Sequence, residues 1–376
     1  GDVSYETSLA SANGKSIARF RPQGQQTVRR RNWIYRTIRV PWRGVKFAVS
    51  CMLRAQAEIV HSAQALRLLK GADLLVIAGG GQIDDYWGGP FGHPCSLFKW
   101  ACLARMSHTP VVFLSVGVGS LRSFWSRYFA HGALRLAKYR SYRDDESKRL
   151  LSDATFTHSD PVYPDLAFSH PAAKEEAPAG RSFINAGFVV GFSPIAFFAP
   201  RVWPEHNEPV YQRYIKLLSE FLTRILEANH AVVLFTTSLM DKVAVKDLLA
   251  ALSATSVREP QLARLRSLDQ IGLNQQLAEI EKMDIVIASR LHGVILAHLL
   301  GKPALAISYD RKVCAHMKAM AQERFCLDLC DCTLSQLWDR FTALASEKEM
   351  IGGGICQRVG EYRQQLDRQY EFFDEL

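Results

Sequence analysis

The stretch DIVIASRLHGVILAHLLGKPALAIS, residues 284–308, decides the fold of this chain. Continuous apolar runs of strand length stand at both ends, and a segment long enough for a helix lies between them. We expect a strand over 284–288, a helix over 291–300 and a second strand over 303–308. A strand, a helix and a strand in this order form a βαβ unit with parallel strands. The stretch therefore predicts a parallel α/β sheet.

The same alternation of strand and helix patterns extends through both halves of the sequence. We expect strands over 74–78, 110–115, 139–143, 184–192 and 231–236. We expect helices over 55–69, 96–106, 123–138, 211–228, 241–252 and 274–282, the last with Asn274 as its cap. In the tail, 335–376, we expect separate helices divided by the glycine triplet 352–354. The pattern predicts an α/β fold of two Rossmann-like, doubly wound domains that face a cleft.

The length and the prolines suggest where the two domains meet. A chain of 376 residues is roughly two domains long. Pro161, Pro164, Pro171 and Pro178 mark a break in composition. We therefore expect an N-terminal domain over 1–170, with a glycine loop, and a C-terminal domain over 181–376, with an Arg-Leu-His motif and a helical tail.

Composition excludes several classes of protein. No apolar run reaches the ~18 residues that span a bilayer, since even 186–200 is interrupted by Ser193-Pro194, so an integral membrane protein is excluded. The eight cysteines include no Cys-x-x-Cys pair, which favours reduced thiols and a cytoplasmic protein. Cys326, Cys330 and Cys332 alone approach ligand spacing, but they lack the paired doublets of a zinc site. We expect no metal.

The positive charge is concentrated near the N-terminus. The chain has 46 Lys and Arg against 37 Asp and Glu, a net charge of +9. Between Thr7 and Ala57 there are eleven basic residues and no acidic one, so the remainder carries −2. Within residues 27–54, basic residues alternate with aromatic and aliphatic ones. Such a segment fits the inner face of an anionic membrane, a solvated connection between elements or, less well, a nucleic acid.

Ser289-Arg290-Leu291-His292 lies where the first strand of the opening stretch ends and its helix begins. Backbone N–H groups at a helix start favour an anion, and Arg290 can grip phosphate or carboxylate. His292 can exchange protons near neutral pH. A structural histidine is the alternative.

In the first half, Gly79-Gly80-Gly81 follows a predicted strand and leads to Asp84 and Asp85. Glycines let the backbone approach a ligand closely. A dinucleotide fingerprint is excluded because Asp84 stands where its last glycine would be needed, and no phosphate-binding Gly-x-x-x-x-Gly-Lys motif occurs. Either aspartate could act as a base for a sugar hydroxyl. Capping of the following turn is the alternative.

Two further polar clusters follow predicted strands. Arg143 precedes the acids Asp144 to Glu146, as expected before a helix start, and would point toward the crevice. Lys312 belongs to the cluster 308–313 after the last strand of the opening stretch. A surface ion pair and a solvated turn are the respective alternatives.

These pieces together resemble the polysaccharide pyruvyl transferase family. The resemblance rests on 78–81 with Asp84 and Asp85, on 115–119 and on 143–147. Its most specific block comprises 289–292, 301–303 and 309–313. The resemblance covers roughly two thirds of the chain. Family members usually open with a strand followed by an Asn-x-Gly-Asp loop, to which only Gly1-Asp2 could correspond, and on that match the first strand is missing from this chain.

The resemblance implies a glycosyltransferase-B-like pair of domains and transfer of pyruvate from phosphoenolpyruvate to a saccharide acceptor as a ketal, with no metal or other cofactor. It implies that Arg290 and His292 contact the enol phosphate and that Arg143 is a further anion ligand. Gly80, Gly81, Ser289 and Lys312 complete the expected phosphoenolpyruvate site. We expect His292 as general acid, or as acid and base in turn, and Asp85 or Asp84 as base for the sugar hydroxyl.

Two other functions remain open. A nucleotide-sugar glycosyltransferase would have the same two-domain fold. A non-catalytic anion- or glycan-binding protein, attached to a membrane by its basic segment, is the third possibility. The acceptor would be a polysaccharide or its lipid-linked precursor at the inner face of the plasma membrane, and nucleic acid is an unlikely partner.

Overall fold

The computed structural model describes residues 49, 52–53, 56–151, 159–171, 186–255, 259–268 and 272–375. Backbone contacts group residues 65–376 into one compact unit, separate from residues 1–64. The description below concerns this larger unit. Most of the basic segment 27–54 and nearly all of the expected linker, 171–180, lie outside the described residues. The predicted boundaries of two domains are therefore not tested.

The first sheet has three parallel strands in the order β1-β2-β3. Its strands are β1 (Leu75–Ala78), β2 (Val111–Val116) and β3 (Tyr139–Tyr142). The helical elements of this half are η1 (Gly89–Phe91), α2 (His93–Met106), α3 (Phe124–Arg135), α4 (Asp145–Arg149) and η3 (Leu166–Ser169). Residues 56–69 are also helical. The expected alternation is confirmed here.

The second sheet has six parallel strands in the order β6-β5-β4-β7-β8-β9. Its strands are β4 (Val189–Ser193), β5 (Ala231–Leu234), β6 (Leu265–Ser267), β7 (Ile285–Ala288), β8 (Ala304–Ser308) and β9 (Cys326–Asp328). Counted within this half, the order is 3-2-1-4-5-6, the doubly wound order of a Rossmann fold. The predicted fold class is confirmed.

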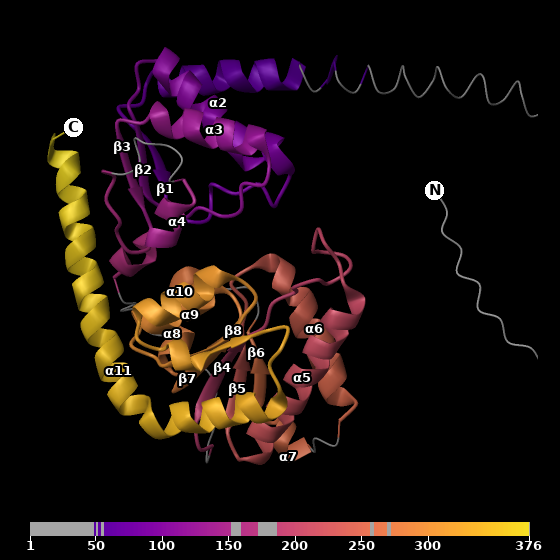
Figure 1. The fold of residues 1–376 in the computed structure, drawn as a ribbon. Helices are drawn as coiled ribbons and strands as arrows, with labels where there is room; N and C mark the ends of the chain where they lie inside the picture. Colours follow the sequence, from indigo (N-terminus) through magenta and orange to yellow (C-terminus); the bar gives the residue numbers. More distant parts are fainter. Residues whose placement is uncertain are drawn as a thin grey trace, which may run out of the picture. The chain divides into compact units, whose positions relative to one another are not determined.

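Helices accompany this sheet as its topology requires (Figure 1). They are α5 (Glu208–Glu227), η4 (Leu239–Asp241), α6 (Lys242–Ser253), α7 (Glu259–Leu262), α8 (Leu273–Glu281), α9 (Leu291–Leu299), α10 (Arg311–Ala319), η5 (Glu323–Phe325), α11 (Leu334–Tyr370) and η6 (Glu371–Glu375). The stretch 284–308 supplies β7, α9 and β8 as expected. None of the helices in the described part of the chain is both long and apolar enough to span a membrane.

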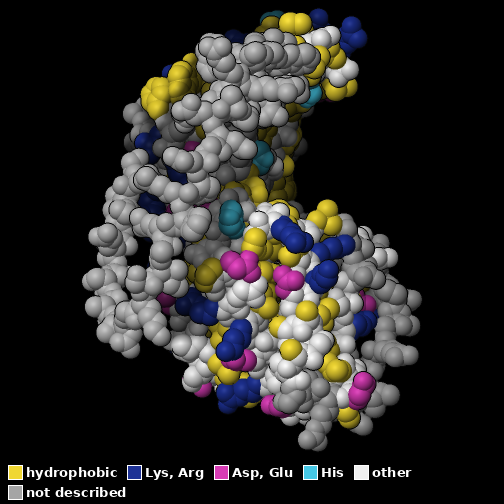
Figure 2. Space-filling view, turned by 90° about the vertical axis from the view of Figure 1, so that its right-hand side faces the viewer, with side chains coloured by type: hydrophobic (Ala, Val, Ile, Leu, Met, Phe, Trp, Pro, Cys, Tyr) yellow, Lys and Arg dark blue, Asp and Glu magenta, His cyan; other side chains and the backbone are white. Residues whose placement is uncertain are grey.

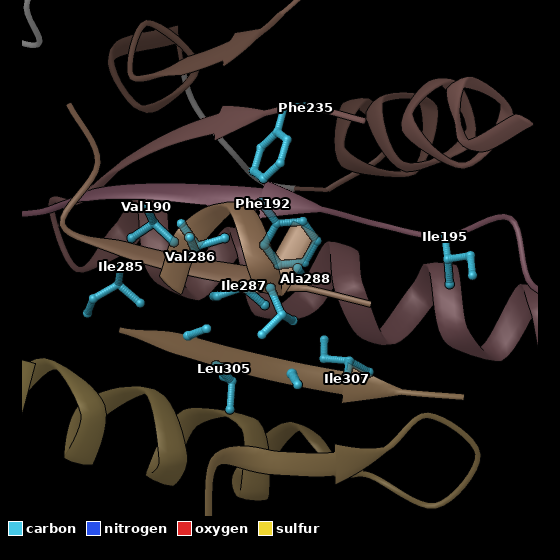
Figure 3. Close-up of a cluster of buried hydrophobic side chains, with 14 of the residues drawn as sticks. Val190, Phe192, Ile195, Phe235, Ile285, Val286, Ile287, Ala288, Leu305 and Ile307 are labelled. Atoms are coloured by element: carbon cyan, nitrogen blue, oxygen red, sulfur yellow. The ribbon is translucent and has the colours of Figure 1, made fainter. Parts of the chain in front are cut away.

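Each sheet has its own hydrophobic core. In the second half, the apolar runs of β7 and β8 are buried on both faces, since all their residues are buried. Figure 3 shows Ile285, Ile287 and Leu305 in this cluster, with Ile287 beside Phe192 from β4. Continuous apolar strands are what a covered parallel sheet requires. The core fixes the strand ends from which the candidate site residues emerge.

Two local expectations are wrong. Helix α8 begins at Leu273 with Gly272 as its N-cap, so Asn274 is not the cap. Helix α11 is a single helix that runs through the glycine triplet, although Figure 1 shows it bending along its length. A Cβ on Gly352 would stand 3.1 Å from the Gly301 carbonyl oxygen. A glycine in the triplet thus allows close helix packing and does not end the helix.

The end of α11 packs on the first sheet. Gln369 is fully buried, and its amide nitrogen donates to Ser141 Oγ at 2.5 Å. Its amide oxygen accepts from Ser115 Oγ at 3.0 Å. Phe372 stacks on Tyr139 of β3 at 4.2 Å. Helix α11 therefore joins the two sheets, because its first turns pack in the second half.

Candidate functional site

A large cavity of about 570 Å³ lies at the carboxyl ends of strands from both sheets. The residues that line it follow β1, β2, β3, β4, β7 and β8: Gly81, Asp84, Tyr86, Trp87, His93, Val118, Gly119, Ser120, Arg122, Asp144, Glu146, Leu150, Phe197, Phe198, Trp203, Glu205, Arg290 and Tyr309 to Lys312. In open α/β sheets, ligands bind at this edge. Figure 2 shows Lys and Arg side chains beside Asp and Glu side chains in the lower part of the view, which holds the second sheet.

A small cavity of about 70 Å³ shares Asp144 and Lys312 with the large one. Arg143, Asp165 and His316 also line it. Of the predicted site residues, Asp84, Gly81, Arg290 and Lys312 thus line the large cavity, and Arg143 and Lys312 line the small one. His292, Asp85, Gly80 and Ser289 line neither.

Arg290 is held by a carboxylate that the sequence analysis did not assign to the site. Arg290 precedes α9, and its Nη2 donates to Asp241 Oδ1 at 3.0 Å while its Nε donates to Oδ2. Asp241 is fully buried and also accepts the Ala196 N–H at 3.0 Å. The Trp203 ring lies 6.0 Å from the guanidinium. The bidentate pair fixes the orientation of Arg290 at the cavity wall.

His292 lies in the first turn of α9, and its side chain is partly exposed. Charged groups of both halves, Asp165, Arg143 and Arg290, act on its ring. Partial burial of its ring lowers its pKa, Asp165 opposes this shift, and Arg143 and Arg290 add to it. A lowered pKa makes the imidazolium a stronger acid that is less populated at neutral pH. His292 is thus electrostatically linked to both predicted arginine clamps.

The two neighbouring aspartates differ in what they contact. The Oδ2 of Asp85 accepts from Ser126 Oγ at 2.6 Å and from the backbone N–H groups of Arg122 and Ser123 at 2.7 and 3.3 Å. These contacts hold the start of α3. Asp84 lies against Gly119, and its Oδ1 accepts the Tyr86 N–H at 2.6 Å. Asp84 is therefore the member of the pair that faces the large cavity.

The glycine loop approaches α10. Gly79 and Gly80 have φ of 47° and 64°, values that favour glycine. The Gly80 carbonyl accepts the Gly117 N–H at 2.7 Å, which joins the loops after β1 and β2. A Cβ on Gly81 would lie 3.7 Å from Lys312 Nζ. The structure thus brings the glycine loop and Lys312 together.

Ser289 is buried in the second sheet. Its Oγ shares a 2.9 Å hydrogen bond with the Tyr214 hydroxyl, and its N–H donates to the Ser193 carbonyl. The Tyr214 hydroxyl in turn accepts the Ile195 N–H at 3.2 Å. Ser289 therefore fastens the end of β7 to α5 and β4. This contact positions Arg290, the next residue.

Arg143 is almost completely buried at the end of β3, with 6% of its side chain exposed. Its Nη1 donates to Asp165 at 3.2 Å and its Nε to Asp144 at 3.4 Å. Its Nη2 is buried without a hydrogen-bond partner in the structure. One donor of this guanidinium is therefore unused.

A chain of hydrogen bonds ends at His316 in the small cavity. The Ala304 N–H donates to Gln322 Oε1 at 3.2 Å, and this bond fixes the orientation of the Gln322 amide. The amide nitrogen of Gln322 therefore donates to His298 Nε2 at 2.7 Å. His298 Nδ1 then donates to His316 Nε2 at 3.0 Å. This arrangement assigns the His316 proton to Nδ1. Burial lowers the pKa of His316 to about 4, Asp165 opposing the shift and Arg143 adding to it.

Asp165, Asp241 and His316 were missed by the sequence analysis as site residues. Asp241 was expected only as a helix start, and Asp165 lies in the proline-rich stretch. Single acids in a loop carry no signal of the arginine that they pair with. Within the described residues, no group of three or more His, Cys, Asp or Glu side chains could hold a metal ion.

The sequence profile of the polysaccharide pyruvyl transferase family matches residues 15–311, more than half of the chain. The chain belongs to this family. The match includes both glycine loops, Arg143 and the Arg290-Leu291-His292 motif. It ends at Arg311, within the cluster after β8. No curated protein matches the sequence.

Solved structures confirm the glycosyltransferase-B-like fold of this family member. A putative UDP-N-acetylglucosamine 2-epimerase from Listeria monocytogenes is similar at 10% identity and a TM-score of 0.53, over 84% of this chain and 80% of that one. A UDP-forming alpha,alpha-trehalose-phosphate synthase from Burkholderia xenovorans is similar at 10% identity and a TM-score of 0.54, over 85% of this chain and 78% of that one. A UDP-GlcNAc 2-epimerase from Neisseria meningitidis bound to UDP-GlcNAc is similar at 12% identity and a TM-score of 0.50, over 78% of this chain and 75% of that one. At such identities the likeness concerns the fold.

Proposed function

We propose that this protein transfers pyruvate from phosphoenolpyruvate to two hydroxyls of a sugar, forming a ketal on a cell-surface polysaccharide or its lipid-linked precursor. Membership of the pyruvyl transferase family supports the transfer of pyruvate to a saccharide. The observation that carries the proposal is that Arg290, Lys312 and Asp84 line one cavity, at strand ends of both sheets. Cations and a carboxylate at one site suit an anionic donor and a hydroxyl nucleophile.

The reaction sets clear requirements. A proton adds to the methylene carbon of the enol, and one sugar hydroxyl adds to the oxocarbenium-like carbon while losing its proton. Phosphate leaves, and the second hydroxyl closes the ketal. Phosphoenolpyruvate and a diol thus give a ketal and inorganic phosphate. The scheme needs an acid, a base and cationic groups for the phosphate and carboxylate, and it requires neither metal nor nucleotide.

The clamps in this proposal are Arg290, Arg143 and Lys312. Arg290 is oriented by Asp241, and Lys312 lines both cavities. The unused Nη2 of Arg143 can donate to an anion oxygen. Gly80 and Gly81 provide the loop beside Lys312, and Ser289 holds the segment that carries Arg290. The donor would lie where the two cavities adjoin.

We assign the general acid to His292 and the hydroxyl base to Asp84. Asp84 is preferred to Asp85 because the Asp85 carboxylate already accepts three hydrogen bonds at the start of α3. His292 is assigned from its position beside Arg290 and its electrostatic link to Arg143. A positioned acid typically contributes about 10²–10⁴ in rate.

The decisive experiment is incubation with phosphoenolpyruvate and a panel of terminal hexoses. Phosphate release together with a mass gain of pyruvate less water would support the proposal. His292→Ala should lose most turnover while its melting temperature is retained. The matched control is His206→Ala, an exposed histidine outside both cavities. Wild-type turnover by His292→Ala would remove His292 from the mechanism.

A nucleotide-sugar glycosyltransferase is the second candidate, because the similar solved structures include UDP-sugar enzymes. Thermal stabilisation by phosphoenolpyruvate, and not by UDP- or GDP-sugars, would distinguish the two. A non-catalytic glycan- or anion-binding protein would be stabilised by its ligand without releasing phosphate.

We further propose that the protein works in the cytoplasm at the inner face of the plasma membrane, with its basic segment, residues 27–54, near anionic lipid. The basis is the eleven basic residues and the absence of acids between Thr7 and Ala57. Neutralising Arg29, Arg30, Arg31 and Arg36 should weaken binding to anionic vesicles. Unchanged binding would contradict this role.

A further inference from the structure

We propose that an exposed aromatic surface on α2 and α3 docks this protein on the interface of an anionic phospholipid bilayer. The aromatic patch consists of Phe91, Phe98, Phe124, Trp125, Tyr128 and Phe129. None of these residues lines either cavity. The inference therefore goes beyond the proposed reaction and concerns a surface different from the basic segment 27–54.

The patch is exposed to an extent that is unusual for large aromatic side chains. Phe91 and Phe124 are each 73% exposed, and Trp125 and Tyr128 are each 52% exposed. The opposite face of α3 is occupied, since Ser126, Ala130, Ala133 and Leu134 are buried. Helix α3 thus has one apolar face in the core and another at the surface. A contiguous exposed apolar patch indicates an interaction site.

The rings form one continuous surface from three elements. Phe124, Trp125 and Tyr128 contact one another on the first two turns of α3, with ring centroids 5.6 to 6.4 Å apart. Phe129 connects them to Phe98 of α2 at 5.8 Å and to Phe91 of η1 at 5.9 Å. The same patch therefore presents Trp and Tyr, whose rings favour the boundary between acyl chains and headgroups.

The charge around the patch suits an anionic surface. Between Tyr86 and Tyr139 the sequence has no acidic residue and six basic ones: Lys99, Arg105, Arg122, Arg127, Arg135 and Lys138. Arg127 and Arg135 on α3 and Arg105 on α2 are exposed. Each cation near an anionic membrane surface adds to binding. Aromatic rings with basic residues beside them are typical of interfacial membrane binding.

A second copy of the chain is a poorer occupant. In a two-fold dimer formed through this patch, each surface would meet its own copy, so basic residues at its edge would face basic residues. No acidic residue of this segment could offset that repulsion. Glu205, in the second half, pairs with Arg122. Charge complementarity thus favours anionic lipid.

The test uses the full chain with vesicles of phosphatidylcholine and phosphatidylglycerol, compared with vesicles of phosphatidylcholine alone. The double variant Phe124→Ser, Trp125→Ser should lose about tenfold or more of its partitioning into anionic vesicles. The matched control is Leu239→Ser with Leu273→Ser, which are 63% and 48% exposed in the second half. Partitioning of the native chain should fall as salt is raised. Brominated acyl chains should quench the native fluorescence more than that of Trp125→Phe.

Several outcomes would overturn the proposal. Binding of the patch variant at native strength would assign lipid binding to the basic segment alone. A loss of dimer in the patch variant, without a loss of vesicle binding, would make the patch a contact between copies. Equal binding to neutral and anionic vesicles would show that the basic residues beside the patch do not contribute to membrane binding, and it would contradict the proposed preference for anionic lipid. Phosphate release with a soluble sugar is measured separately, so failure of the pyruvyl transfer leaves the vesicle result interpretable.

Discussion

Arg290 and Arg143 both follow the carboxyl end of a parallel strand, β7 and β3 respectively, but their surroundings differ. Arg290 forms a bidentate pair with one fully buried carboxylate, Asp241, and lines the large cavity. Arg143 lies between two acids at longer distances, 3.2 and 3.4 Å, and lines the small cavity. It also keeps one buried nitrogen without a partner.

The difference shows that a strand-end arginine is not by itself an anion site. The fork of Arg290 is already matched by a carboxylate, which fixes its geometry and neutralises its charge. Arg143 has weaker partners and an unused donor. We therefore expect both arginines to contact the donor anion, with Arg143 making the stronger contact and Arg290 the more rigidly oriented one. The following experiments test this contrast.

The largest expected effect is on folding stability. Asp241→Asn leaves the partly buried Arg290 guanidinium without its charge partner and should lower the free energy of unfolding by about 3–5 kcal/mol. Asp165→Asn leaves Arg143 with Asp144 and should cost less, about 1–3 kcal/mol. Urea denaturation of both variants measures the difference. Equal losses would contradict the proposed contrast between the two arginines.

The next effect is on catalysis. Arg143→Lys removes the unused Nη2 donor and should lower kcat/KM for phosphoenolpyruvate by about 10²-fold, or about 2.7 kcal/mol. Arg290→Lys should lose stability as well as activity, because a lysine cannot reproduce the bidentate pair with Asp241. Steady-state phosphate release and thermal melting together separate the two cases. A larger activity loss in Arg290→Lys than in Arg143→Lys, at equal stability, would reverse our assignment.

A glycine beside Arg143 offers a subtler perturbation. A Cβ on Gly117 would stand 2.6 Å from the Gly80 carbonyl oxygen and 2.7 Å from Arg143 Nη2. Gly117→Ala should therefore cost about 1–3 kcal/mol by overpacking and weaken phosphoenolpyruvate binding. The control, Gly353→Ala, meets no atom within 4 Å on α11 and should be stabilising. Calorimetry with phosphoenolpyruvate would report the binding, and unchanged affinity in Gly117→Ala would show that Arg143 is not a ligand.

The smallest expected effect is a pH dependence of stability from the small cavity. The pKa of His316 is about 4 in the folded protein, below the ~6.5 of an unfolded chain, so the unfolded state binds more protons between these values. The contribution of His316 to the free energy of unfolding is therefore fully present above about pH 6.5. On acidification to about pH 5 the free energy of unfolding should fall by about 1–2 kcal/mol. His298, whose pKa burial also lowers, adds to the loss. In His316→Gln the difference between neutral and acidic urea melts should shrink, whereas in His206→Gln it should not.

Much of the fold was predictable because its signals are local. The strands of 284–308 are continuous apolar runs, and all of their residues prove to be buried. The start of α3 at Ser123 was predicted from neighbouring residues, and the Ser123 side chain accepts the Ser126 N–H. Local patterns of this kind need no knowledge of distant contacts.

The parts that were not predicted depend on residues far apart in the sequence. Asp241 lies 49 residues from Arg290, and Gln369 lies 254 residues from Ser115. No periodicity links such partners. The continuous path of α11 through its glycines also depends on packing, since glycine weakens an isolated helix. The roles of His292 and Asp84 in catalysis remain predictions.

Helix α11 makes the far end of the chain a structural part of the first sheet. The amide of Gln369 bonds with Ser115 and Ser141, and Phe372 stacks on Tyr139, so these contacts form only after nearly the whole chain has left the ribosome. The first sheet therefore cannot complete its packing during synthesis. A short deletion from the C-terminus should disturb the strand ends that carry Arg143, although these lie more than two hundred residues upstream.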